Sequence, residues 1–168
     1  LYGLGSENEN LPGFITIKPT LSHGGAKNWS SAFLPGAYQG TAIGHAGLEV
    51  EALRAEPIEY LVQKELAGDQ QRYELEMLEN INRKHAEMRR YDPELEARIQ
   101  SFELAARMQV EAPEAFDVET ESIATKKLYG LDDPVTADFA WQCLLARRLV
   151  ERDVRYIQCT HSYKWDQH

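Results

Sequence analysis

The chain begins and ends with short stretches in which the order of apolar and polar residues is typical of β-strands. Residues 14–18 alternate apolar and polar side chains between Pro12-Gly13 and Pro19. A period of two bounded by turn residues predicts a short strand. A second strand-like run begins at Tyr156 and leads into the last residues. A strand that follows a helical region, with another strand far upstream, implies a sheet covered by helices.

From about Pro57 to Val150 apolar residues recur every three or four positions, which predicts amphipathic helices packed side by side. Asp92-Pro93 ends one helix and starts the next, because Asp caps free backbone N–H groups and Pro costs nothing at the first helical position. Gly130 is expected to end a short helix, and Asp133-Pro134 repeats the start signal. The predicted stripes are Leu75, Leu78, Ile81, His85 and Met88 in the first helix, a buried set of Leu95, Ile99, Phe102 and Ala106 in the second, and an inward face of Phe139, Cys143, Ala146 and Val150 in the last.

These patterns divide the chain into three segments of a single incomplete domain. Residues 1–55 are a Gly-rich strand and loop segment, residues 56–150 are helical, and residues 151–168 hold a strand and a candidate metal loop. Nine of the eleven glycines lie in the first 47 residues. The aperiodic run from Ser22 to Gly47 carries several aromatic residues, so we expect a packed, functional loop. We expect the chain to be the interior of a longer polypeptide, inactive by itself.

Charge and composition exclude several classes of partner. A formal net charge of -9 over 168 residues argues against nucleic acid, since phosphate binding relies on clustered Lys and Arg. No stretch approaches the roughly 20 apolar residues that cross a bilayer. The compartment stays open, because export would depend on a signal upstream of Leu1. Cys143 and Cys159 are too few for a disulfide framework, and two buried thiols are favoured over a bridge or metal ligands.

The clearest candidate chemistry follows the last predicted strand. Asp166 and His168 are two residues apart, so on an extended segment both point the same way, and His161 is close enough to join them. These side chains can hold a divalent metal. The sequence does not decide between zinc, manganese and calcium, although the imidazoles favour zinc, iron or manganese over calcium or magnesium. Solvated loop residues are the alternative interpretation of the same spacing.

The Gly-rich loop offers a second group of candidates. Asn28, Trp29 and Gln39, with Lys27 nearby, offer neutral and cationic donors to an anionic ligand, and hydrogen bonding within the loop is an equal alternative. The run Ser22-His23-Gly24-Gly25 matches neither a nucleophile elbow nor a phosphate loop, so a plain turn is favoured. We expect His45 to be exposed and His85 to pack on its helix rather than bind a metal.

Several long strings of this chain together resemble one family. They are Tyr2 to Ile15, Asn28 to Thr41 (NWSSAFLPGAYQGT), Asp92 to Gln109, Leu128 to Asp132, Phe139 to Arg152, and Trp165 to His168 (WDQH). They occur in the order found in bacterial sulfatase-related proteins of domain of unknown function family 1501, and the similarity covers the whole chain. The resemblance implies an alkaline-phosphatase-like fold, a mostly parallel sheet between helices.

That resemblance also implies metal-assisted hydrolysis of a phosphate or sulfate ester, on a small molecule or a polysaccharide. Asp166 and His168 match an Asp and a His that bind one metal after a strand in that superfamily, while His161 matches less closely. The nucleophile is expected outside this chain. Two other hypotheses stay open: a non-catalytic binding or scaffold protein that keeps the fold, and a helical interaction module with a Gly-rich arm. The sequence does not determine the oligomeric state.

Overall fold

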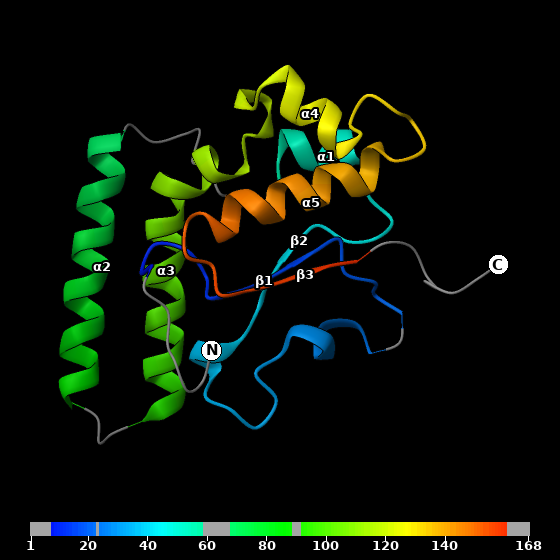
Figure 1. The fold of residues 1–168 in the computed structure, drawn as a ribbon. Coiled ribbons are helices and arrows are strands. Elements are labelled where there is room, and N and C mark those ends of the chain that lie inside the picture. The colour runs from blue at the N-terminus through cyan, green and yellow to red at the C-terminus, as the bar shows by residue number, and fades with distance from the viewer. Residues whose placement is uncertain (1–7, 23, 59–67, 89–91, 161–168) are drawn as a thin grey trace.

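The computed structural model describes residues 8–22, 24–58, 68–88 and 92–160, a mixed α/β structure that is about 57% helical (Figure 1). Its elements, with η marking 3-10 helices, are β1 Phe14–Ile17, η1 Gly25–Trp29, η2 Gly36–Tyr38, β2 Thr41–Ile43, α1 Val50–Ala55, α2 Gly68–Met88, α3 Pro93–Phe116, η3 Val118–Thr120, α4 Ile123–Tyr129, α5 Ala137–Val150 and β3 Tyr156–Cys159. The α/β class is confirmed, and the alkaline-phosphatase-like architecture stays a prediction. None of the described helices has the length and apolar character needed to cross a membrane.

The three described strands form one parallel sheet in the order β2-β1-β3, so the last strand lies beside the first. Ile15 is in register with Thr41 on one side and with Ile157 on the other. Both predicted strands are therefore confirmed. The stretch predicted as loop also contains β2, because a strand of three residues is too short to show a period and depends on its pairing with β1.

Two different layers cover the two faces of the sheet. Ile15 and Ile17 belong to the core on the side of α5, which crosses this face (Figure 1). Side chains alternate along a strand, so Phe14 faces the other way. Its ring meets that of Tyr156 edge-on, with centroids 4.9 Å apart. A side chain at Gly40 would come within 2.7 Å of the Phe14 ring, which explains a glycine at this point of the covering loop.

Helix α5 is the centre of the core. Its fully buried apolar residues are Trp141, Leu144, Leu145 and Leu149. The predicted inward face is wrong: Phe139, Cys143 and Ala146 are only half-buried, and Val150 is 60% exposed. The helix contacts β3 on one side and α3, η3 and α4 on others. A helix covered from several directions has no single apolar stripe, so its period does not identify the buried residues.

The predicted start of helix α3 is confirmed, but its buried residues differ from the predicted set. The Asp92 side chain accepts hydrogen bonds from the backbone N–H groups of Glu94 and Leu95, and Pro93 occupies the first turn. Phe102, predicted to be buried, is 66% exposed. The buried residues are instead Met108, Ala112, Ala115 and Phe116. Burial is therefore concentrated in the carboxyl-terminal half, which approaches the core.

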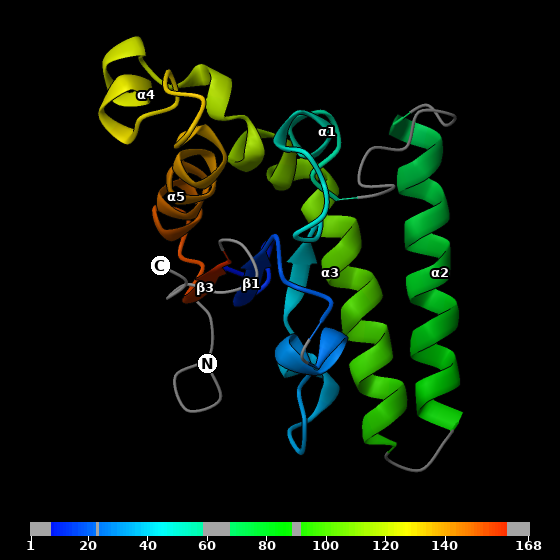
Figure 2. The same cartoon turned by 90° about the vertical axis from the view of Figure 1, so that its right-hand side faces the viewer.

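Helix α2 packs against α3, on the side away from the sheet (Figure 2). The predicted helix is confirmed, and it begins at Gly68. Its apolar residues are largely solvent-exposed: Tyr73 70%, Leu75 37%, Met77 64%, Leu78 54%, Ile81 49% and Met88 79%. The apolar stripe therefore predicts helix formation correctly, but the described residues bury only part of it.

Helix α4 ends as predicted, whereas α5 begins later than predicted. Gly130 adopts a left-handed conformation with φ of 85°, and the basic residues Lys126 and Lys127 lie in the last turn of α4. Asp133 accepts a hydrogen bond from the backbone of Val135 at 2.9 Å, but α5 starts only at Ala137. The Asp-Pro pair therefore caps a turn that precedes the helix.

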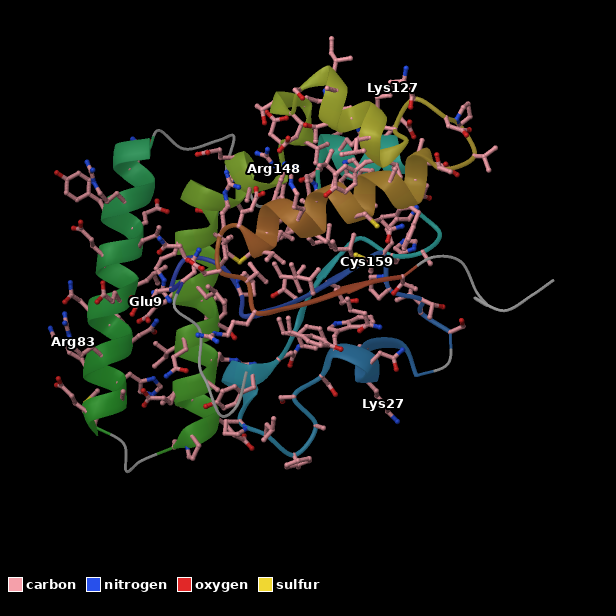
Figure 3. All side chains as sticks on the ribbon, in the orientation of Figure 1. Glu9, Lys27, Arg83, Lys127, Arg148 and Cys159 are labelled. Atoms are coloured by element: carbon pink, nitrogen blue, oxygen red, sulfur yellow. The ribbon has the colours of Figure 1, made fainter. Side chains whose placement is uncertain are left out.

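A buried charge network joins α5 to the end of α3. Arg148, 7% exposed, donates to the backbone carbonyls of Ala115 at 3.1 Å and Glu114 at 2.8 Å (Figure 3). Such a cation satisfies the free carbonyls at a helix carboxyl end. Arg148 and Arg147 each donate to one carboxylate oxygen of Glu121, at 2.7 Å. The hydrogen bond from Arg148, followed by that from Arg147, lowers the pKa of Glu121 below its ordinary value.

Candidate functional site

The carboxyl ends of the three described strands lie at one edge of the sheet, because all three strands are parallel. Backbone pairing continues to this edge. The backbone N–H of Lys18 donates to the Ile43 carbonyl at 2.9 Å, and the backbone N–H of Thr160 donates to the Ile17 carbonyl at 3.2 Å. Open α/β sheets commonly bind ligands at this position, where side chains from several strands converge. We therefore take this carboxyl edge as the candidate site.

The three predicted metal ligands lie outside the described residues. His161, Asp166 and His168 follow Thr160 in sequence, and Thr160 is the last described residue of the carboxyl edge. Among the described residues, no group of three His, Cys, Asp or Glu side chains is arranged to hold a metal ion. The ligand roles of these three residues therefore stay predictions.

A buried lysine is the most unusual described residue at the carboxyl edge. Lys18 is 4% exposed and adopts a left-handed backbone conformation with φ of 50°, which is uncommon for a residue with a side chain. Its ammonium donates to a carboxylate oxygen of Asp138, in the first turn of α5, at 2.5 Å. The ion pair offsets the cost of removing the ammonium from water and fixes the end of β1 against α5.

Gln142 extends this pair into the interior. It lies one helical turn after Asp138, and its side-chain amide donates to the other carboxylate oxygen at 2.9 Å. Gln142 is 1% exposed, and its side-chain oxygen has no hydrogen-bond partner among the described residues. Asp138 therefore already binds two donors, which makes it a poor candidate for a metal ligand at the carboxyl edge.

The turn after β2 brings a histidine to the same edge. Ala46 donates to the Pro19 carbonyl at 3.0 Å, so the turns that follow β1 and β2 are joined. The neighbouring His45, predicted to be exposed, is half-buried, and its Nδ1 accepts a hydrogen bond from the backbone of Gly47 at 3.2 Å. That bond requires an Nδ1 without a proton. Among the described histidines, His45 lies nearest in sequence to the carboxyl end of a strand, because it follows shortly after β2.

The two cysteines are free thiols and both are half-buried. Cys159 lies at the end of β3, beneath α5, and its thiol contacts the backbone carbonyl of Gln142 at 3.8 Å (Figure 3). Burial, and secondarily the nearby Cys143, raises the pKa of Cys159 to about 11. Burial raises the pKa of Cys143 as well. Both groups are therefore protonated near neutral pH and are weak nucleophiles there.

The predicted substrate-binding residues are divided between η1 and the segment that follows η2. Asn28 is exposed and Trp29 is half-buried, and both belong to η1, which lies on the face of the sheet opposite α5 (Figure 1). Gln39 follows η2 and lines two hollows against α3, whereas neither Asn28 nor Trp29 lines them. The loop is closed by a hydrogen bond from the Gly40 backbone to the Trp29 carbonyl at 2.7 Å. Substrate binding by these residues stays a prediction.

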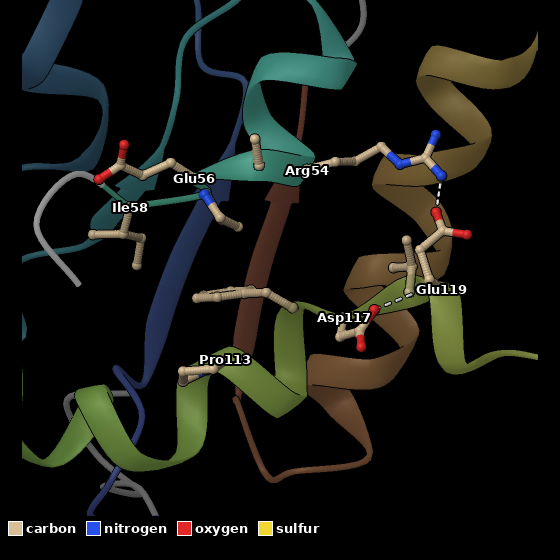
Figure 4. A pocket seen from close by; sticks show the side chains of 10 residues that line it. Arg54, Glu56, Ile58, Pro113, Asp117 and Glu119 are labelled. Atoms are coloured by element: carbon tan, nitrogen blue, oxygen red, sulfur yellow. Dashed lines mark hydrogen bonds and ion pairs between the residues drawn. The ribbon is translucent and has the colours of Figure 1, made fainter. Parts of the chain in front are cut away.

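A separate apolar pocket of about 280 Å³ lies between the ends of α1 and α3 (Figure 4). Phe116, Pro113 and Ile58 line it, and an ion pair between Arg54 and Glu119 bounds one side. Asp117 accepts a hydrogen bond from the Glu119 backbone at 3.0 Å. Among the described residues, the lining contains no histidine, cysteine, serine or lysine, and most of its surface is apolar, so this pocket offers space mainly for an apolar group.

Sequence reasoning missed Lys18, Asp138 and Gln142. In the sequence, Lys18 has the pattern of the polar end of an alternating strand. Asp138 and Gln142 have the pattern of polar positions on an amphipathic helix. The only local signal is the spacing of four between Asp138 and Gln142, which places both on one helix face. Their contact with Lys18 joins residues 120 positions apart, so it depends on the tertiary structure.

Comparison with known proteins identifies a family but not an activity. The model of the family DUF1501, described as a protein of unknown function, matches residues 1–168. No curated protein and no solved structure matches the chain. A relation to sulfatases therefore stays a prediction from resemblance. Because the match covers all 168 residues, the chain belongs to the DUF1501 family of proteins of unknown function.

Proposed function

We propose that the chain contributes to a metal-dependent hydrolase of phosphate or sulfate esters, with Asp166 and His168 as metal ligands. His161 would be a further ligand or a hydrogen-bond donor to the bound group. The observation that carries the proposal is the parallel pairing of β3 with β1, because β3 leads directly in sequence to these three residues. Strands of a parallel sheet commonly deliver ligands from their carboxyl ends.

The residue types fit a divalent metal. Two imidazoles and a carboxylate suit zinc or manganese, and such a metal polarises an ester oxygen and stabilises the charge that develops on it. Among the described residues at the carboxyl edge, Asp138 already accepts hydrogen bonds from Lys18 and Gln142, at 2.5 and 2.9 Å, so the proposal does not use it as a metal ligand. Within this chain, the proposal therefore assigns metal ligands only to residues 161–168, and further ligands are expected outside it.

The test is a metal titration. We expect isothermal titration with Zn²⁺ and Mn²⁺ to show about one binding site in the unmodified chain. The double variant Asp166→Ala/His168→Ala should weaken binding by about a hundredfold or more, since loss of even the groups that support metal ligands costs up to that factor. His85→Ala is the matched control, because His85 lies on α2. Unchanged affinity in the double variant would remove the basis of the proposal.

A non-catalytic binding or scaffold protein is the second candidate. The exposed apolar residues of α2, such as Tyr73, Met77 and Met88, favour a partner surface on the helical segment. This candidate requires no metal. A chain that binds neither Zn²⁺ nor Mn²⁺ in the titration, while remaining folded by circular dichroism, would favour the scaffold over the hydrolase.

A further inference from the structure

A long groove lies between α3 and the loop of residues 33–41. Figure 2 shows the ribbon of this loop beside α3, which η2 contacts. The groove consists of two hollows of about 690 Å³ and about 560 Å³, which share Gly36, Gln39 and Ser101 and therefore adjoin. Their lining extends along α3 from Pro93 to Gln109. At 1.5 Å per helical residue this is roughly 24 Å, long enough for a chain-like ligand.

The described residues that line the groove include both apolar and polar side chains, and their charges balance. In the first hollow Glu94 is matched by Arg98, and in the second Glu9 is matched by Arg107. Because the whole chain carries a formal charge of -9, a site without excess positive charge does not favour a phosphate backbone or a sulfated polymer. The occupant that suits this lining is uncharged.

Neutral hydrogen-bonding side chains lie along the middle of the groove. Gln39, Gln100 and Ser101 are exposed, and their side chains make no hydrogen bond to another described residue. Amide groups both donate and accept, and hydroxyl groups do the same. These three side chains can therefore meet a ligand that presents many hydroxyl groups.

Two phenylalanines lie in the lining of the first hollow, one from each side. Phe33 comes from the loop and is 94% exposed, and Phe102 comes from α3 and is 66% exposed. Two large apolar rings exposed in the same hollow provide an apolar contact surface for a ligand. Their flat faces match the C–H faces of sugar rings, whose edges carry the hydroxyl groups.

We propose that this groove binds a neutral carbohydrate chain, with Phe33 and Phe102 stacking on sugar rings and Gln39, Gln100 and Ser101 bonding their hydroxyl groups. The exposed rings, the unpaired amides, the balanced charge and the length together select this class of ligand. Among the described residues, the groove is lined by α3, the 33–41 loop, residues 8–13 and Ile58, and neither Lys18 nor Asp138 belongs to this lining. Carbohydrate binding is therefore independent of any metal at the carboxyl edge.

Saturation-transfer NMR and isothermal titration test the proposal with neutral cello-, xylo-, manno- and galacto-oligosaccharides. We expect binding that strengthens with chain length in the unmodified protein. Phe102→Ala should weaken it roughly tenfold, the size of one aromatic contact, and Phe33→Ala/Phe102→Ala should abolish it. Gln39→Ala should weaken it by a smaller factor. Tyr73→Ala is the matched control, because Tyr73 is an exposed aromatic on α2, outside the groove.

Three outcomes would overturn the proposal. They are no binding of any of these sugars at millimolar concentration, sugar binding that survives in the Phe33→Ala/Phe102→Ala variant, and preference for dextran sulfate or for an extended peptide over every neutral sugar. Thermal unfolding of each variant verifies that the fold is kept, since both phenylalanines are exposed and their loss should cost little stability. Zn²⁺ affinity should be the same in all groove variants, which separates this test from that of the metal site.

Discussion

The sheet with α5 and the helix α2 both show the regular apolar periods of secondary structure, but their apolar side chains differ greatly in burial. Ile15, Ile17 and Leu145 are completely buried, whereas Tyr73, Met77 and Met88 on α2 are more than 60% exposed. Both regions have the period of regular secondary structure. The difference teaches that periodicity predicts which residues share a face, whereas burial depends on whether another layer covers that face.

Truncating one leucine in each region gives the largest expected contrast. Leu145→Ala in α5 should lower the free energy of unfolding by about 3 kcal/mol, because it leaves a cavity in the core. Leu78→Ala on α2, where the side chain is 54% exposed, should cost less than about 1 kcal/mol. Urea unfolding of both variants measures this contrast. Equal losses would show that α2 is buried as deeply as α5 in solution.

Glu121→Gln tests the charge network that ties α5 to α3. The change leaves Arg148 buried without its carboxylate, so we expect a loss of about 3 kcal/mol near neutral pH. The pKa of Glu121 is lowered from its ordinary value near 4.5, so its contribution is complete above that pH and is lost as the pH falls through the lower, folded value.

Urea unfolding at several pH values should therefore show a weaker acid dependence in Glu121→Gln than in the unmodified chain. Glu151→Gln is the control, because Glu151 pairs with Arg147 at 3.3 Å but is 56% exposed. A loss below about 0.5 kcal/mol is expected for an exposed pair. Similar losses for both variants would contradict the buried network.

Asp138→Asn should destabilise the chain by a smaller amount, about 1 to 2 kcal/mol, because Asp138 is 46% exposed and water compensates in part for its lost charge. Lys18→Met alone and Lys18→Met/Asp138→Asn complete a double-mutant cycle by chemical denaturation. If the two residues form the ion pair described here, the double variant loses less stability than the sum of the single variants. Additive losses would exclude their coupling.

Asp92→Ala should have the smallest of these effects, about 1 kcal/mol, because it removes the side-chain acceptor that caps α3. Hydrogen exchange should accelerate in the first turns of α3 and remain unchanged in α5. Asp132→Ala is the control, because Asp132 is exposed and makes no capping bond to a described helix. Unchanged exchange at residues 94–97 would mean that the cap adds nothing measurable.

Much of the fold could be predicted because its signals are local. The alternation at residues 14–17, the Asp92-Pro93 start and the Gly130 end each depend on neighbouring residues, and all three are confirmed. The buried faces of α3 and α5 were harder to predict from the sequence. Phe102 and Val150 fit the apolar stripes of their helices, but they lie where no described layer covers them. The candidate site is divided in the same way: its predicted metal ligands were inferred from local spacing and family resemblance, whereas Lys18 and Asp138 meet only in the fold.

The sequence by itself determined helices α2 to α5, two of the strands, the α/β class and the acidic charge that disfavours nucleic acid, because each depends on residues close in the chain or on composition. Helix α1 was not predicted, since it lies in the segment expected to hold only strand and loop. Only the tertiary structure decided that β3 pairs with β1, that Lys18 is buried against Asp138, and that Phe33 and Phe102 line one groove. These arrangements join residues far apart in sequence. Local periodicity contains no information on such contacts, which form when layers pack and exclude water.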